Sequence, residues 1–308
     1  MTTAEPTDRA DAPAKRGAEG DSSRSPLLEP RKRIEGAVLN VFSHGFLVLW
    51  TVLAAGPLVW ALMNALKDSG DILANPWALP GSIDWANWSN AWSRARIGRY
   101  AANSLVIVAV SVPLTMLFGS MAAYVLARFD FKGARIVYFT FVGGMAFPVV
   151  MALVPLFFVM KNLSLLDTRH GLIMVYIAYS MPFTIFFMTT FFRTLPSSVS
   201  EAAEIDGASH TRIFFQVMLP MAKPGLISVG IFNFLGHWNQ YVLPFALNHN
   251  EDDYVLTQGI GLLFAQAGYR SDYGRLFAGL VMAALPILVV YIIFQRQVQA
   301  GLTAGAVK

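Results

Sequence analysis

Six long stretches of the chain contain no lysine, arginine, aspartate or glutamate, and each has 20 or more residues. A helix rises about 1.5 Å per residue, so roughly 20 apolar residues cross a hydrocarbon core about 30 Å thick. We therefore predict an all-α integral membrane protein with six transmembrane helices. The uncharged stretches are Gly36–Leu66, Tyr100–Ala127, Ile136–Met160, Gly171–Phe192, Pro224–Asn250 and Leu276–Gln295. The predicted spans lie near residues 40–66, 102–127, 136–160, 171–192, 224–247 and 276–295.

The overall composition agrees with this prediction. Hydrophobic residues make up 55% of the 308 residues and charged residues only 14%, with a mean hydropathy of +0.51. An ordinary soluble domain has about 25% charged residues, so the composition disfavours a soluble enzyme. The sequence contains no cysteine, which excludes disulfide bonds, thiolate metal sites and cysteine nucleophiles. We expect no metal site and no catalytic residues in this chain.

The first 35 residues differ from the rest, because they are rich in Pro, Ser, Ala, Gly and charged residues. We predict that residues 1–35 form a disordered cytoplasmic tail and that residues 36–308 form the membrane domain. The tail is not a cleavable signal peptide, because the apolar stretch after it is too long and no small-residue cleavage site closes it. The cluster Arg31, Lys32 and Arg33 favours a cytoplasmic N-terminus. Six spans then place both termini in the cytoplasm.

The loop between the fourth and fifth spans, residues 195–225, has the most specific pattern. We predict a short helix that starts with a capping box formed by Ser198 and Glu201. Gly207 after it permits a left-handed backbone conformation or a close approach of another group. A second short helix follows, with an apolar face, and we expect Pro220 to end it. The loop lacks the basic face of a lipid-binding helix, so we interpret it as a lever that docks onto a soluble partner.

This loop resembles the EAA loop of ABC importer permeases. The residues that carry the resemblance are Glu201, Ala202, Ala203, Asp206, Gly207, Ala208, Phe214, Leu219 and Pro220. From about residue 37 to 308, the span pattern is similar to that of six-span carbohydrate permeases related to the second maltose-permease subunit. The stretches Phe141–Pro148 and Phe232–Tyr241 resemble actinobacterial permeases for N-acetylglucosamine and chitobiose.

The resemblance implies the permease subunit of a type I ABC importer that moves a carbohydrate across the cytoplasmic membrane. It implies a second permease subunit, two ATP-binding subunits and an extracytoplasmic solute-binding protein as partners, in a shell of membrane lipid and without nucleic acid. The nine residues above would then couple transport to ATP hydrolysis. The chain lacks the G-x-x-x-x-G-K-[ST] phosphate-binding pattern, so we expect no cofactor in this chain and ATP-Mg in the partner subunits.

Polar and aromatic residues gather in the fifth predicted span. Trp238, Tyr241, Asn239 and Asn233 are candidates for the substrate path, because aromatic rings stack on sugars and amides bond to hydroxyl groups. In one continuous helix, Trp238 and Tyr241 would share a face within about 60°, with Asn239 on the flank. The alternative is that these side chains hydrogen-bond neighbouring helices. The nearby His237 has no carboxylate beside it and is interpreted as structural.

Three other functions remain as alternatives. An ABC permease for another class of solute would have the same overall pattern. A secondary transporter commonly carries ionisable groups in its spans, but here the predicted spans hold no acidic or basic residue except His44 and His237. A membrane-embedded hydrolase would need a nucleophile with a base or a metal, and neither is evident. We therefore predict a transport subunit rather than an enzyme.

Overall fold

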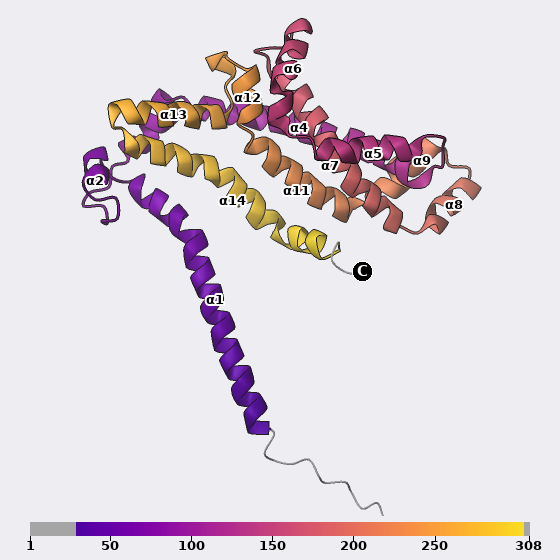
Figure 1. The fold of residues 1–308 in the computed structure, drawn as a ribbon, viewed down its shortest axis with the longest axis horizontal. Coiled ribbons are helices and arrows are strands. Elements are labelled where there is room, and N and C mark those ends of the chain that lie inside the picture. Colours follow the sequence, from indigo (N-terminus) through magenta and orange to yellow (C-terminus); the bar gives the residue numbers. More distant parts are fainter. Residues whose placement is uncertain (1–28, 305–308) are drawn as a thin grey trace, which may run out of the picture. The chain divides into compact units, whose positions relative to one another are not determined.

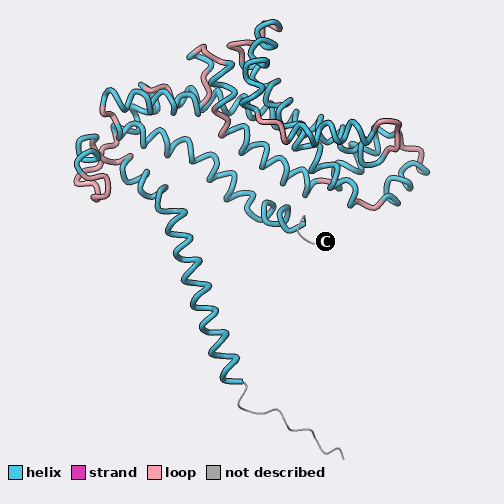
Figure 2. The backbone as a smooth tube through the Cα atoms, in the orientation of Figure 1, coloured by secondary structure: helices cyan, strands magenta, loops and turns pink. Residues whose placement is uncertain are grey.

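The computed structural model describes residues 29–304, and within that range the chain contains helices, turns and loops but no strand (Figure 2). The predicted all-α class is confirmed. The chain forms two units, one up to Gly56 and one from Pro57 onward. Four helices are long and apolar enough to cross a membrane, or up to six if two strongly bent helix pairs each count as one span.

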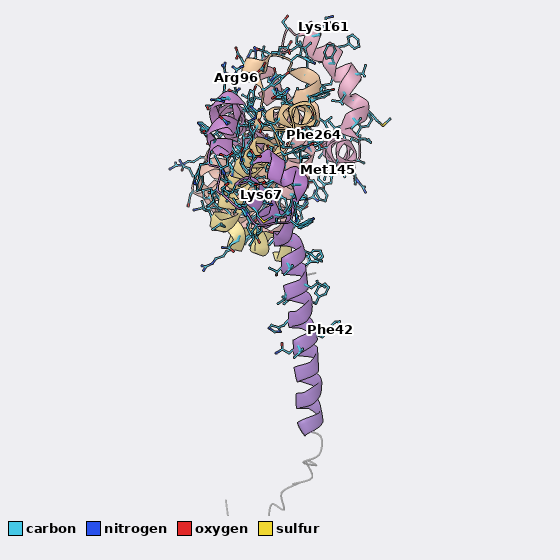
Figure 3. The ribbon with its side chains drawn as sticks, turned by 90° about the vertical axis from the view of Figure 1, so that its left-hand side faces the viewer. Phe42, Lys67, Arg96, Met145, Lys161 and Phe264 are labelled. Atoms are coloured by element: carbon cyan, nitrogen blue, oxygen red, sulfur yellow. The ribbon has the colours of Figure 1, made fainter. Side chains whose placement is uncertain are left out.

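Helix α1, Glu29–Asn64, contains the first candidate span, Asn40–Asn64. Its apolar side chains from Val41 to Leu53 are exposed, and those around Phe42 stand out from the helix (Figure 3). The predicted disordered tail is wrong for residues 29–35, because they form the first turns of this helix. The apolar pattern begins only after them, so composition alone could not reveal their helicity. Residues 1–28 of the predicted tail lie outside the described residues.

Helices α4, Ile97–Arg128, and α7, Arg169–Thr194, form the most extensive helix pair of the second unit (Figure 1). A Cβ atom added to Gly119 would lie only 2.5 Å from Cγ2 of Thr184. Glycine therefore lets the two backbones approach closely, as is common between membrane helices. Together with α14, Tyr273–Ala304, these helices contain the predicted spans 102–127, 171–192 and 276–295.

The third predicted span, 136–160, is not one straight helix. It consists of α5, Ala134–Met145, and α6, Val149–Asn162, which are bent by 106°. Pro148 lies at the break with an extended backbone. A proline has no N–H group and disfavours helical geometry at the residue before it, here Phe147. Uncharged sequence continues through the break, so the apolar pattern gave no sign of the change in direction.

The fifth predicted span, 224–247, is also wrong as a single helix. Helix α11 runs only from Lys223 to Trp238, and a separate short helix, α12, covers Val242–Leu247. At the end of α11, the side-chain amide of Asn239 donates to the Leu235 carbonyl oxygen at 2.9 Å. Such local bonds offer the backbone an alternative to a continued helix.

The segment between the fifth and sixth predicted spans contains a helix. Helix α13, Leu256–Arg270, packs against α14 and α4. A Cβ atom on Gly259 would lie 2.1 Å from Cδ2 of Tyr100, so the glycine admits this ring. The helix has only 15 residues and several polar ones, so it does not form an apolar stretch long enough to be predicted as a span. The other short elements on this side are α2, Ser69–Ala74; α3, Ala86–Ser89; η1, Asn90–Arg94; and η3, Glu251–Asp253.

Candidate functional site: the helical loop and the polar cavity

The loop between α7 and α11 folds into four short helical segments. They are α8, Ser197–Ile205; α9, His210–Ile213; η2, Phe214–Met218, with π-helical bonding; and α10, Leu219–Met221. The predicted capping box is wrong, because Pro196 occupies the N-cap and Ser198 lies within the helix. Proline is well suited to a helix start, since its missing N–H would have no partner there.

Gly207 has the predicted left-handed conformation, with a φ of 78°. Its N–H donates to the Glu204 carbonyl at 2.9 Å, and the Ala208 N–H donates to the Ala203 carbonyl at 3.0 Å. These bonds close the end of α8 and turn the chain toward α9. A Cβ atom on Gly207 would have no neighbour within 4 Å. The glycine is therefore required by backbone conformation and not by crowding within this chain.

The inner face of the second helical stretch is buried. Ile213 and Met218 have no exposed surface, and they pack with Phe214 in a cluster that includes Tyr124 of α4 and Phe192 of α7. The predicted apolar face is therefore present. The prediction that Pro220 ends the helix is wrong, because α10 continues to Met221 and the 78° bend follows at Ala222.

No described residue covers the outer face of α8, so this face is exposed. Glu201, Ala202 and Asp206 are exposed, and the apolar side chain of Ile205 is 87% exposed. Exposed apolar side chains rimmed by polar ones are typical of interaction surfaces. Arg128 of α4 anchors the start of the loop, because its Nη2 donates to the Leu195 carbonyl at 2.7 Å. The loop thus presents an exposed surface that carries both apolar and acidic side chains.

A second candidate site is a cavity of about 320 Å³ between α5, α7 and α11. Its centre is His237, whose Nδ1 lies 2.8 Å from Oγ of Ser111 and whose Nε2 lies 2.7 Å from Oγ of Ser180. The histidine thereby ties three helices together. This agrees with its interpretation as structural, although it also lines the cavity. Serines in otherwise apolar stretches were the sequence signal for this site, and they were overlooked.

Several further polar groups line the same cavity. Asn233 donates from Nδ2 to Oγ1 of Thr184 at 2.9 Å, and Gln240 lies at the end of α11. The buried hydroxyl of Tyr176 has no hydrogen-bond partner within residues 29–304. Phe147, Tyr179 and Phe183 supply aromatic surface. A cavity with aromatic walls and a few convergent polar groups is the usual form of a small-molecule site.

The other predicted path residues lie on a different side of α11. Trp238 is only 4% exposed, stacks on Phe234 and donates from Nε1 to the Ala283 carbonyl at 3.2 Å. With Asn239 and Tyr241 it lines a mainly apolar groove of about 480 Å³ against α13 and α14. The continuous helix assumed for placing Tyr241 ends at Trp238. The structure therefore brings these three together and separates them from Asn233.

A charged cluster joins the start of α4 to η3 at the opposite end from the helical loop. Arg96 pairs with Glu251 at 3.1 Å and also with Asp252, and Arg99 pairs with Asp252 at 2.9 Å. The hydrogen bond from Arg96, and then the charge of Arg99, lower the pKa of Asp252. Arg169 of α7 pairs with Asp253 at 2.6 Å. These pairs neutralise the charges of Arg96, Arg99 and Arg169.

No group of three or more His, Cys, Asp or Glu residues in the described part of the chain could hold a metal ion. The helical loop presents an exposed surface with apolar and charged side chains, and the cavity offers hydrogen-bonding groups beside aromatic rings.

Comparison with known proteins adds to this description. The family model described as "Binding-protein-dependent transport system inner membrane component" matches residues 115–301. The chain is 50% identical to the diacetylchitobiose uptake system permease protein NgcG of Streptomyces coelicolor, over 85% of this chain and 87% of that protein. It is 34% identical to the melibiose/raffinose/stachyose import permease protein MelC of Bacillus subtilis, over 82% of this chain and 91% of that protein.

A solved structure shares the fold. It is a bacterial ABC transporter involved in the import of the acidic polysaccharide alginate, with a TM-score of 0.72 and 24% sequence identity. The similarity covers 88% of this chain and 99% of that one.

Proposed function

Because the chain belongs to the family of binding-protein-dependent transport system inner membrane components, we propose that it is the permease subunit of an ATP-driven importer of carbohydrate. It is an integral inner-membrane protein and a transport component rather than an enzyme. As a member of this family it works with a solute-binding protein. The observation that carries the proposal is the 50% identity, over most of both chains, to a diacetylchitobiose uptake permease.

We propose an amino-sugar oligosaccharide of the diacetylchitobiose type as the cargo. The resemblance over Phe141–Pro148 and Phe232–Tyr241 supports this choice, and both stretches contribute to the wall of the polar cavity. Amide groups such as those of Asn233 and Gln240 can both donate to and accept from hydroxyl and acetamido groups. The alternative is that the importer carries a different class of solute, such as an amino acid.

The polar cavity is proposed as part of the substrate path. His237, Asn233 and Gln240 would face the sugar, with Tyr179 as an aromatic wall. The alternative path is the groove of Trp238, Asn239 and Tyr241. The groove that Trp238 lines is mainly apolar, whereas the polar cavity gathers His237, Asn233 and Gln240, so we place the path on the Asn233 side.

Energy coupling is assigned to the loop between α7 and α11. The exposed face of α8, with Ile205 at its end, would dock onto an ATP-binding subunit, where ATP-Mg is bound and hydrolysed. The buried face of the same loop packs on α4 and α7, so movement of the partner would be transmitted to those helices. Two ATP-binding subunits and a second permease subunit complete the proposed assembly, and both termini of this chain would lie in the cytoplasm.

The cargo is tested by uptake in a strain that lacks this gene. We expect loss of uptake of labelled diacetylchitobiose, restored by the intact chain, with uptake of an unrelated amino acid unchanged. Unchanged uptake of every sugar in a panel would refute the carbohydrate assignment. Loss of amino-acid uptake instead would support the alternative class of solute.

The path is tested by cysteine labelling, because the chain has no native cysteine. In the assembled transporter, Gln240→Cys should react with a water-soluble maleimide and be protected by the transported sugar, whereas Trp238→Cys should not react. Sugar-protected labelling at 238 and 241, with none at 240, would place the path in the other groove.

A further inference from the structure

A basic cavity of about 720 Å³ lies where the α4–α5 turn meets the last turn of α7. Three cations line it, Lys132, Arg135 and Arg193, together with one acid, Asp130. All four side chains are exposed. The cavity is at the same end of the bundle as the helical loop, since Phe129 beside it packs edge-on against His210 of α9 at 5.3 Å (Figure 1).

The two arginines are held over aromatic rings rather than over carboxylates. Cζ of Arg193 lies 5.4 Å from the ring centre of Tyr138, and Cζ of Arg135 lies 5.8 Å from that of Phe139. Because Arg193 belongs to α7 and Tyr138 to α5, the first contact directs a guanidinium across to the neighbouring helix. Among the side chains that the structure describes, no ion pair joins a carboxylate to Lys132, Arg135 or Arg193. With three cations and one acid in its lining, the cavity carries a net positive charge.

The nearby Arg128 differs from these cations, because it has a structural hydrogen bond to the backbone. Its guanidinium donates to the Leu195 carbonyl and is partly buried. The three cations of the basic cavity make no such bond to the described backbone. Arginine clusters of this kind bind phosphate groups, because the planar guanidinium donates two parallel hydrogen bonds to phosphate oxygens.

An apolar groove of about 320 Å³ adjoins the basic cavity. The two share Leu126 and Phe131, which line both. Every residue that lines the groove is apolar, and it runs between the outer faces of α4 and α5. Its other main lining residues are Met121, Val125, Val137 and Phe141. A basic cavity that continues into a purely apolar groove matches a molecule with a phosphate at one end and a hydrocarbon chain at the other.

We propose that the basic cavity and the apolar groove together bind one anionic phospholipid of the leaflet on the side of the helical loop. The phosphate would lie between Arg135 and Arg193, with Lys132 at the rim, and an acyl chain would lie along Val125 and Val137. Basic pockets between membrane helices on the cytoplasmic side commonly bind anionic headgroups. The apolar groove distinguishes a lipid from a free phosphate ion, which has no use for it.

The site has a direct mechanical consequence. A bound lipid would link α5, the first half of the bent third span, to the end of α7, from which the helical loop starts. The link would act at the base of the proposed coupling loop. Anionic lipid would therefore favour one relative position of α5 and α7.

The test uses the assembled transporter, with its partner subunits, in phosphatidylcholine nanodiscs supplemented with phosphatidylglycerol. Retained phosphatidylglycerol is counted by native mass spectrometry and its affinity measured by titration. The double substitution Arg135→Gln with Arg193→Gln should weaken binding by about thirtyfold, since each cation near an anionic surface contributes about fivefold. The charge-preserving pair Arg135→Lys with Arg193→Lys should keep most of the affinity. The matched control, Lys223→Gln with Arg296→Gln, removes two exposed cations that do not line the basic cavity and should leave the affinity for phosphatidylglycerol unchanged.

A soluble headgroup, sn-glycerol 3-phosphate, forms the second arm of the experiment. Weak binding of this compound, with strong binding of phosphatidylglycerol, supports a lipid site that uses the apolar groove. Equal affinity of phosphatidylglycerol for the glutamine variant and the intact chain would overturn the proposal. So would equal binding of the soluble phosphate, or lipid binding that appears only when the ATP-binding subunits are removed, because the cavity would then be part of their interface.

Discussion

Gly207 offers the sharpest test of the helical loop. A glycine can be required by a left-handed backbone conformation or by crowding around it, and here the two reasons can be separated. Its φ is 78°, and a Cβ atom there would touch nothing within 4 Å. Substitution should therefore act through backbone strain alone within this chain. The turn it forms sets the angle between α8 and α9, which is the angle at which the proposed docking face meets its partner.

The expected magnitude follows from the left-handed conformation. A residue with a Cβ atom pays about 1–2 kcal/mol to adopt it, a β-branched residue more, and asparagine little. About 1.4 kcal/mol corresponds to a tenfold change in an equilibrium. Gly207→Ala should thus lower uptake by about five- to thirtyfold, Gly207→Val by more than that, and Gly207→Asn only slightly.

The assay is uptake of labelled sugar in a strain with no other copy of the gene, together with membrane abundance and ATPase activity of the purified assembly. Normal abundance with low uptake would place the defect in coupling. The matched control is Gly268→Val in α13, because Gly268 also has no neighbour within 4 Å but lacks a positive φ. It should leave uptake close to normal.

Two outcomes would refute this reasoning. Normal uptake by Gly207→Val would remove the loop from the coupling mechanism. Equal damage by Gly207→Asn and Gly207→Val would show that strain is not the cause, and would point instead to close approach of a partner subunit at this position.

Three further predictions address other parts of the structure. His237→Phe should lower the free energy of unfolding by about 2 kcal/mol, because two buried serines lose their hydrogen-bond partner. Thermal melting of the purified assembly measures this loss. An unchanged melting temperature would contradict the role of His237 in linking three helices. The ion pair of Asp252 should stabilise the loop around η3 at every pH above the ordinary aspartate pKa of about 4. This stabilisation should be lost as the pH falls through the lowered pKa of Asp252. Proteolysis of residues 248–255 should therefore rise at acid pH. Arg96→Gln should raise that pKa, and so shift this rise to higher pH; the same profile in both proteins would refute the assignment. A reporter that works only in the cytoplasm should be active when it is fused after Lys308. Activity of a reporter that works only outside the cell would overturn the proposed topology.

The candidate site was predictable only where local chemistry determines it. A glycine between two short amphipathic segments predicts a left-handed turn, and the structure has one at Gly207. The helix start was misplaced, because Pro196 occupies the N-cap position and Ser198 lies within α8. The polar cavity was missed because Ser111, Ser180 and His237 are separated by more than 50 residues in sequence, and only folding brings their side chains within hydrogen-bond distance.

By itself, the sequence determined that this protein is helical and embedded in a membrane, because long uncharged stretches admit no other low-energy arrangement in hydrocarbon. It could not determine where those stretches bend. The chain breaks at Pro148 and α11 ends at Trp238, although the uncharged sequence continues through both points. The side of α11 that faces a cavity was likewise decided by tertiary structure, because Trp238 finds its hydrogen-bond acceptor on α14 while His237 finds its partners on α4 and α7.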